Sequence, residues 1–253
     1  MFLIPDKALV PNTVAEATDK AWIVLIQDVL DPVDVHSILT ALSPEIPVGA
    51  PIFIRPDTSS WEEAGEYQRQ LIADIFAKCR HSVPPRFAVF SIAPIPLIVH
   101  LGFLLAYNVP VRYYKLHIDT QSWKWPEVAL QAVDENIQVN GVPQETILER
   151  SEVLIRISLS AFVGQHETDE VAPGLAAQID IFVDKPNRTW IRSPKQLDRL
   201  SEVFRGVLDE IRQKVPYCQR IHLFCAIPAP AALAIGRQIN PRMDPPVSLY
   251  EVF

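Results

Sequence analysis

The sequence predicts an α/β protein made of two fused units of related sequence, each with a mostly parallel sheet. Residues 86–102 (RFAVFSIAPIPLIVHLG) and residues 220–236 (RIHLFCAIPAPAALAIG) both contain an apolar run, a P-x-P turn and a second apolar run that ends at glycine. The matching prolines Pro94 and Pro228 are 134 residues apart (228 − 94 = 134), and the other landmarks of the repeat keep this spacing. In both halves, runs rich in β-branched residues alternate with helical patterns, which is typical of parallel sheets covered by helices on both faces.

The first unit is expected to span residues 21–118. Its long helix should begin next to Trp61, because Ser59 with Glu62, and Ser60 with Glu63, have the spacing of a capping box. The predicted elements are, in order, strands at residues 22–27 and 51–55, this long helix, the strand and helix of the repeat, and a strand at residues 111–116.

The second unit is expected to span residues 153–253, with residues 119–152 as a bridging segment. Its long helix has a clear start, because Ser193 and Gln196 can form a capping box with Pro194 at the first helical position. The predicted elements are strands at residues 154–159 and 178–183, this helix, the strand and helix of the repeat, and a strand at residues 247–253.

Composition restricts the possible partners. The chain has 253 residues, a net charge of −7 and a pI of about 5.4. A protein of this charge is not expected to bind polymeric nucleic acid, which needs a basic surface, but a few local donors can still hold a small anion. Three cysteines are too few for a disulfide framework, and the first residues have no signal-peptide pattern. We therefore expect a cytoplasmic protein.

One apolar stretch resembles a membrane span by length alone. Residues 87–107 contain no charged side chain, but Pro94 and Pro96 in its middle would break a spanning helix. The other copy of the repeat contains Arg237. We interpret the stretch as a buried strand, turn and helix, and expect no membrane partner.

No enzyme motif predicts a catalytic residue. Neither a G-x-G-x-x-G nor a P-loop nor a G-x-S-x-G pattern occurs. Cys218, His222 and Cys225, with Cys79 and His81 in the other half, suggest a zinc site, but their spacing matches no usual pattern and His222 alternates with apolar residues in a strand. We expect neither a metal nor a cofactor. His100 lies in an apolar helix and is expected to be a hydrogen-bonded core residue.

The candidate binding residues follow from position. In an open α/β sheet, ligands bind beyond the carboxyl ends of the strands, and here the two P-x-P turns also direct helix N-termini with free amides to that region, which suits phosphate. Three cations can add charge there, and two tryptophans of the bridging segment can stack on bases. The predicted ligand-binding residues are Gln27, Arg55, Ser91, Ile92, Ala93, Pro94, Trp123, Trp125, Ser158, Ser160, Lys185, Arg188, Cys225, Ala226 and Pro228. For either tryptophan, packing between helix and sheet is the alternative.

Two long blocks resemble a known family. The stretch FAVFSIAPIPLIVHLGFLLAYNVPVRYYKLH, followed by TQSWKWP, resembles the first half of a SAVED domain. The ending IHLFCAIPAPAALAIGRQINPRMDPPVSLYEVF resembles the C-terminal signature of that family, and VLIRISLSA resembles the strand that opens its second half. The resemblance covers about residues 22–253, so residues 1–253 are expected to form a single SAVED domain.

The resemblance implies a fold and a function. SAVED domains consist of two fused CARF-like Rossmann-type units, which a pseudo-two-fold axis would relate. They sense cyclic oligonucleotides, such as cyclic tri- or tetra-adenylate, in bacterial anti-phage defence by CBASS and type III CRISPR systems. Ligand binding often makes such sensors associate into oligomers or filaments that activate an effector. The sequence leaves no room for a fused effector, so a separate effector protein is expected, unless the chain is a fragment of a longer one.

Two enzyme alternatives remain. A ring nuclease would cleave the same cyclic oligonucleotide, because positioning a ribose 2′-hydroxyl for in-line attack requires no obvious acid–base pair. A nucleotide hydrolase on a Rossmann-like frame rests on fold analogy alone. For the sensor, the substitutions Arg55→Ala and Lys185→Ala are expected to weaken binding without lowering the melting temperature.

Overall fold

The first half of the chain forms a parallel five-stranded sheet. The computed structural model describes residues 21–79, 84–106, 108–126, 136–169 and 175–252. All of the strand pairs in this sheet are parallel, with the order β2-β1-β4-β5 and with β3 also paired to β1. Its strands are β1 (Ala21–Asp28), β2 (Ile46–Pro47), β3 (Ile52–Phe53), β4 (Phe87–Ile92) and β5 (Val111–Tyr113).

The second half forms another five-stranded sheet, in the order β10-β9-β7-β8-β6. Only β6, which pairs with β8, is antiparallel among its described strands. The predicted α/β fold with mostly parallel sheets is confirmed. The strands are β6 (Gln138–Asn140), β7 (Ser151–Ser158), β8 (Ala177–Phe182), β9 (Cys218–Ala226) and β10 (Val247–Tyr250).

The helices include the four predicted ones and two short additions. Ser60 Oγ accepts the Glu63 N–H at 3.3 Å before α2, and Ser193 and Gln196 form the predicted capping box of α5. The first addition, α1, is capped by Asp34, which accepts the amides of His36 and Ser37. The helices are α1 (Val35–Leu42), α2 (Trp61–Cys79), α3 (Ile95–Leu105), α4 (Gln165–Asp169), α5 (Pro194–Lys214) and α6 (Ala229–Gly236).

Corresponding strands have the same order in both sheets. The order β3-β1-β4-β5 in the first sheet matches β8-β7-β9-β10 in the second, and α3 and α6 occupy matching positions after β4 and β9. The predicted last strand of each half is longer than the observed one. Pairing in the first half ends at Tyr113, since Lys115 turns toward the other half.

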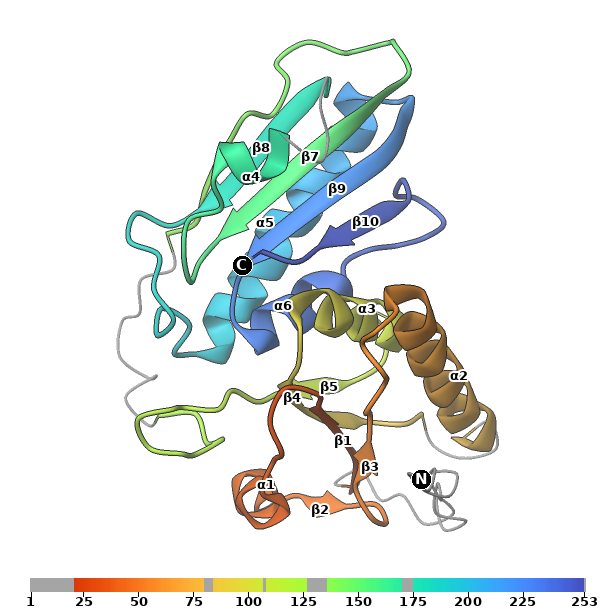
Figure 1. Ribbon diagram of the computed structural model, residues 1–253, viewed down its shortest axis with the longest axis vertical. Helices are drawn as coiled ribbons and strands as arrows, with labels where there is room; N and C mark the ends of the chain where they lie inside the picture. The colour runs from red at the N-terminus through yellow and green to blue at the C-terminus, as the bar shows by residue number, and fades with distance from the viewer. Residues whose placement is uncertain (1–20, 80–83, 107, 127–135, 170–174, 253) are drawn as a thin grey trace.

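Helices α3 and α6 pack against each other between the two sheets (Figure 1). Gly102 of α3 lies against the backbone of Leu233, and Gly236 of α6 lies against the backbone of Val99. Val99 and Leu233 are 134 residues apart, as are the two glycines (233 − 99 = 236 − 102 = 134). A reciprocal contact between equivalent residues is the pattern expected of a local two-fold axis between the helices.

A single apolar core runs through this contact. One cluster of buried side chains includes Leu25 and Phe87 of the first sheet, Ile98 of α3, Leu233 of α6 and Ile155 of the second sheet. The apolar stretch at residues 87–107 therefore contributes a buried strand and helix, as predicted, and no helix in the described part of the chain is long and apolar enough to cross a membrane.

His100 is a hydrogen-bonded histidine in this core. Its Nδ1–H donates to Gln68 Oε1 at 2.7 Å, and the Gln68 amide donates in turn to the Leu97 carbonyl at 3.2 Å. Burial, with a smaller effect from the charge of Arg69, lowers the pKa of His100 from 6.5 to about 4. The imidazole is therefore neutral in the folded protein at neutral pH.

We predict that Gly236→Ala and Gly102→Ala destabilise the protein. A Cβ at these positions would lie 2.0 Å from Val99 O and 2.3 Å from Leu233 O, so the two helices would have to separate. Overpacking of this kind costs about 1–3 kcal/mol. Gly206→Ala in α5 is the matched control, because its Cβ would meet nothing within 4 Å, and alanine in a helix should stabilise by about 1 kcal/mol. Urea unfolding measures all three; equal effects would contradict the packing account.

We also predict a pH dependence of stability from His100. Between its unfolded pKa near 6.5 and its folded pKa of about 4, the imidazole binds a proton only in the unfolded chain. Stability therefore falls as the pH falls through this window. At one pKa unit per ~1.4 kcal/mol, the loss reaches roughly 1–3 kcal/mol. Urea unfolding at pH 7 and 4.5 should show a smaller loss for His100→Asn than for the wild type; parallel losses would refute this assignment.

Candidate functional site

The carboxyl ends of the central strands bring the predicted residues together within each half. Parallel pairing of β1 with β4 sets Gln27 beside Ser91, and pairing of β7 with β9 sets Ser158 beside Ala226. β4 leads through a P-x-P turn into α3, and β9 leads through the equivalent turn into α6. The two helices lie side by side (Figure 1). Gln27, Ser91, Ser158 and Ala226 therefore lie at the ends of the central strands, next to the turns that start the two helices.

The helix N-termini offer fewer amides than predicted. Pro94 and Pro228 are the N-caps of α3 and α6, and neither has a side-chain cap. The second proline of each turn has no N–H, and the amides of Leu97 and Ala231 already donate to Pro94 O and Pro228 O. Within the described part of the chain, the first-turn N–H groups that these bonds leave over are those of Ile95 and Ala229.

The two halves differ at the ends of their central strands. In the first half, Ser91 Oγ donates to Gln27 Oε1 at 2.6 Å, and the buried Gln27 Nε2 has no hydrogen-bond partner in the described part of the chain. The equivalent pair in the second half is Ile157 and Cys225. Burial raises the pKa of the Cys225 thiol, so it stays protonated and is no candidate nucleophile.

Arg55 is committed to an ion pair. Its Nε and Nη2 donate to the two carboxylate oxygens of Asp28 at 2.7 and 2.6 Å, and its guanidinium lies 4.3 Å from the ring centre of Phe53. The Asp28 side chain is 1% exposed whereas that of Arg55 is 57% exposed. The hydrogen bonds to Asp28 raise the pKa of Arg55. This pairing neutralises the charge of Arg55, which is one of the three cations predicted to bind the ligand.

Arg55 and Lys185 are not equivalent, although both precede a proline. Ile26 pairs with Phe53 in the first sheet, and the equivalent Arg156 pairs with Asp180 in the second. Position 55 therefore corresponds to position 182 (180 + 2), and Lys185 lies three residues farther along the loop. The shared motif reflects two loops of different length.

The loop after β8 carries two exposed cations. Lys185 and Arg188 are exposed, and neither side chain has a described ion pair or hydrogen bond. Asn187 N–H donates to Leu159 O at 2.9 Å, and Ser160 N–H donates to Ala226 O at 2.8 Å. The first bond joins the loop to the residue after β7, and the second joins the segment after β7 to the end of β9. The predicted residues of the second half therefore lie together.

The two tryptophans pack against protein in this structure. Trp123 is 1% exposed and meets Phe90 edge-to-face, with ring centres 5.3 Å apart. Half-buried Trp125 donates its Nε1–H to Tyr113 O at 3.0 Å and meets His117 edge-to-face. The packing alternative is observed for both side chains, and the buried Trp123 has no open face for a base. For the half-buried Trp125, stacking on a base stays a prediction.

Other exposed apolar side chains were missed by sequence reasoning. Leu30 is 62% exposed in the loop after β1, and Phe162 is 66% exposed in the loop after β7. Both lie within four residues after the end of a predicted strand. That position is the sequence signal from which they could have been found. An exposed aromatic ring at a strand end is suited to stacking on a base.

The side chains that suggested other chemistry have structural roles. His222 bonds to Tyr250 and Glu152 at 2.8 Å, whereas Cys225 lies on the opposite face of β9. No group of three metal-ligating side chains occurs among the described residues, and His81 lies outside them. Asp180 binds Arg156 through an ion pair of 2.6 Å.

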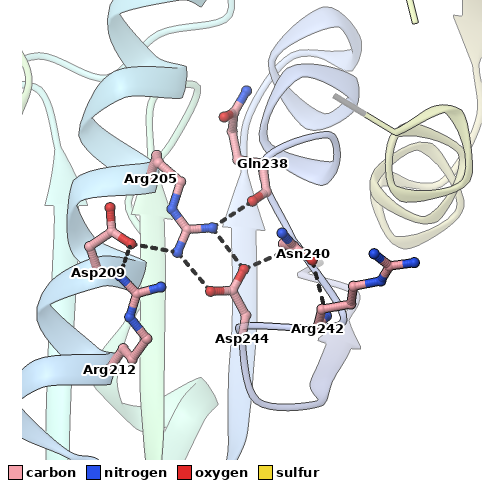
Figure 2. Close-up of polar contacts among 7 residues, drawn as sticks. All are labelled: Arg205, Asp209, Arg212, Gln238, Asn240, Arg242 and Asp244. Carbon is pink, nitrogen blue, oxygen red and sulfur yellow. Dashed lines mark hydrogen bonds and ion pairs between the residues drawn. The ribbon is translucent and has the colours of Figure 1, made fainter. Parts of the chain in front are cut away.

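The sequence GRQIN (residues 236–240), within the ending that resembles the SAVED signature, has a structural role. Figure 2 shows Arg205 of α5 donating to both carboxylate oxygens of Asp244, at 2.7 and 2.8 Å, and to Gln238 O. The Asp244 carboxylate is fully buried and also accepts a hydrogen bond from the backbone N–H of Asn240 at 2.7 Å. Arg237 reaches into the first half, where it donates to Tyr113 OH at 2.6 Å and to Ala106 O at 3.1 Å.

Solved structures of Cap4 SAVED/CARF-domain containing receptors are similar in fold to this chain. The Cap4 SAVED/CARF-domain containing receptor of Acinetobacter baumannii with 2′3′3′-cAAA is similar at 13% identity and a TM-score of 0.57, over 91% of this chain and 48% of that one. The same receptor with 3′3′3′-cAAA is similar at 12% identity and a TM-score of 0.59, over 90% of this chain and 49% of that one. The Cap4 SAVED/CARF-domain containing receptor of Moraxella osloensis is similar at 12% identity and a TM-score of 0.54, over 92% of this chain and 48% of that one. The chain thus spans about half the length of these receptors.

The sequence itself matches a family. A search of curated protein sequences finds no match. Residues 67–253 match SAVED, the SMODS-associated and fused to various effectors sensor domain. That match covers most of the chain and includes both copies of the P-x-P repeat, in agreement with the fold. The chain therefore belongs to the SAVED family.

Proposed function

We propose that this protein is a sensor that binds a cyclic oligonucleotide at the carboxyl ends of its central strands, in bacterial anti-phage defence. The observation that carries the proposal is the SAVED match over residues 67–253, together with a fold like that of receptors solved with cyclic triadenylates. Ligand binding would act through self-association, through a separate effector protein, or through both.

The chemistry of the site supports a ligand with phosphates and bases. Lys185 and Arg188 supply charge that no described carboxylate neutralises, and the N–H groups of Ile95 and Ala229 start two helices whose dipoles favour anions. Phe162 offers an exposed ring for a base. Such local donors suffice although the net charge is −7.

A ring nuclease at this site would have to act by positioning a ribose 2′-hydroxyl, without a base or nucleophile from Asp28 or Cys225. Asp28 is held by Arg55, and Cys225 is kept protonated by burial. Neither group is therefore available as a base or a nucleophile in this arrangement. The remaining site residues are suited to binding and to orienting a phosphate.

We predict that the protein binds cyclic triadenylate tightly and leaves it intact. Isothermal titration calorimetry with cyclic di-, tri- and tetra-adenylates measures affinity and ring-size preference, and chromatography after incubation detects linear products. Mass photometry with and without ligand measures self-association. Linear products would favour the ring nuclease, and binding to none of these ligands would refute both functions.

We predict that the cations of the two halves respond differently to substitution. Lys185→Met and Arg188→Met should each weaken binding about 10-fold, the value of one charged hydrogen bond, without lowering stability. Arg55→Met should lower the free energy of unfolding by about 1–3 kcal/mol, because it leaves the buried Asp28 carboxylate unpaired. The expectation that Arg55→Ala leaves the melting temperature unchanged is revised accordingly.

Calorimetry and thermal unfolding of each variant separate the two effects. Lys78→Met in the exposed last turn of α2 is the control for loss of a positive charge. An unchanged affinity in both Lys185→Met and Arg188→Met would remove this loop from the site. A destabilisation by Lys185→Met equal to that by Arg55→Met would mean that Lys185 is structural.

A further inference from the structure

Lys115 joins the first half to a loop of the second half. Its Nζ donates to Arg188 O and to Ile191 O, both at 2.9 Å, although these residues are more than 70 positions away in the sequence. Burial, with a smaller effect from the charge of Arg192, lowers the pKa of the Lys115 amine. A partly desolvated ammonium that bonds to carbonyl oxygens forms stronger hydrogen bonds than an exposed one.

The other hydrogen bonds of the loop lie within the second half. Asn187 Oδ1 accepts from Thr189 N at 3.0 Å, and Asn187 O accepts from Trp190 N at 3.0 Å. Gln196 of α5 then donates to Trp190 O at 3.0 Å and accepts from Arg192 N at 2.8 Å. Within the described part of the chain, Lys115 is the residue of the first half that bonds to this loop.

The same loop carries the exposed cations of the site. Arg55 of the first half is paired with Asp28, whereas Lys185 and Arg188 have no described partner. The carbonyl of Arg188 is one of the two atoms that Lys115 holds. The backbone from which the Arg188 side chain projects is therefore fixed by a side chain from the other half.

We propose that Lys115 is a positioning residue that holds the loop of Lys185 and Arg188 in the orientation that binds the ligand phosphates. The role rests on the proposed function for its ligand, but its effect on the loop is independent of any ligand. It makes the cationic side of the site depend on the packing between the two halves. Two of the three N–H donors of the Lys115 ammonium are used by the two loop carbonyls.

The test combines hydrogen exchange with binding for Lys115→Met, which keeps the length of the side chain but removes its donors. Without ligand, amide exchange of Trp190 should rise about 10-fold as the loop loosens. Binding of cyclic triadenylate should weaken about 10-fold. Lys115→Arg should restore most of both, and the exposed Lys124→Met is the control for charge. In a Lys185→Met/Arg188→Met background, Lys115→Met should weaken binding little further, because it acts through those cations.

Each outcome decides a different point. Unchanged exchange of the loop in Lys115→Met overturns the proposal, whatever the ligand. Faster exchange with unchanged affinity refutes the link to the ligand, and so does a full additive loss in the double-variant background. If the wild type binds no cyclic oligonucleotide while Lys115→Met loosens the loop, the proposed function fails and the role of Lys115 in holding the loop stands.

Discussion

The close contact between α3 and α6 is the constraint on which the rest of this structure depends. Gly102 and Gly236 let the backbones touch reciprocally at Leu233 and Val99, and the resulting core is continuous through both halves. Because each helix starts directly after a central strand, the packing of the two helices also determines how the two sheets lie relative to each other. A larger side chain at either glycine would move the two sides of the candidate site apart.

Side chains that cross between the halves reinforce this arrangement. Arg237, at the end of α6, donates to the segment that connects α3 to β5, and Lys115 donates to the loop after β8. The segment after Arg237 is held in turn by the Arg205–Asp244 pair (Figure 2). In this chain, residues of the C-terminal block that resembles the SAVED signature therefore help to maintain the geometry between the halves.

Related backbones carry different chemistry at the two strand ends. The first half has a buried Gln27–Ser91 pair and a neutralised Arg55, whereas the second has Ile157, Cys225 and two exposed cations. A receptor with unlike sides can hold an anionic ligand in one register even if that ligand is itself nearly symmetric. The strand register shows which residues of the two halves are equivalent, and the P-x-P spacing alone does not identify them.

The sequence by itself determined the α/β class, the parallel strands, the capped helices α2 and α5 and the buried strand and helix within residues 87–105. Apolar period, caps and proline positions are local signals. The strand ends of the candidate site were predictable for the same reason. Only the tertiary structure decided that Trp123 is buried, that Arg55 pairs with Asp28, that Lys185 is not its counterpart and that Lys115 reaches the other half. These are contacts between distant residues, and a side chain's partner depends on packing and loop length, which neither spacing nor residue type encodes.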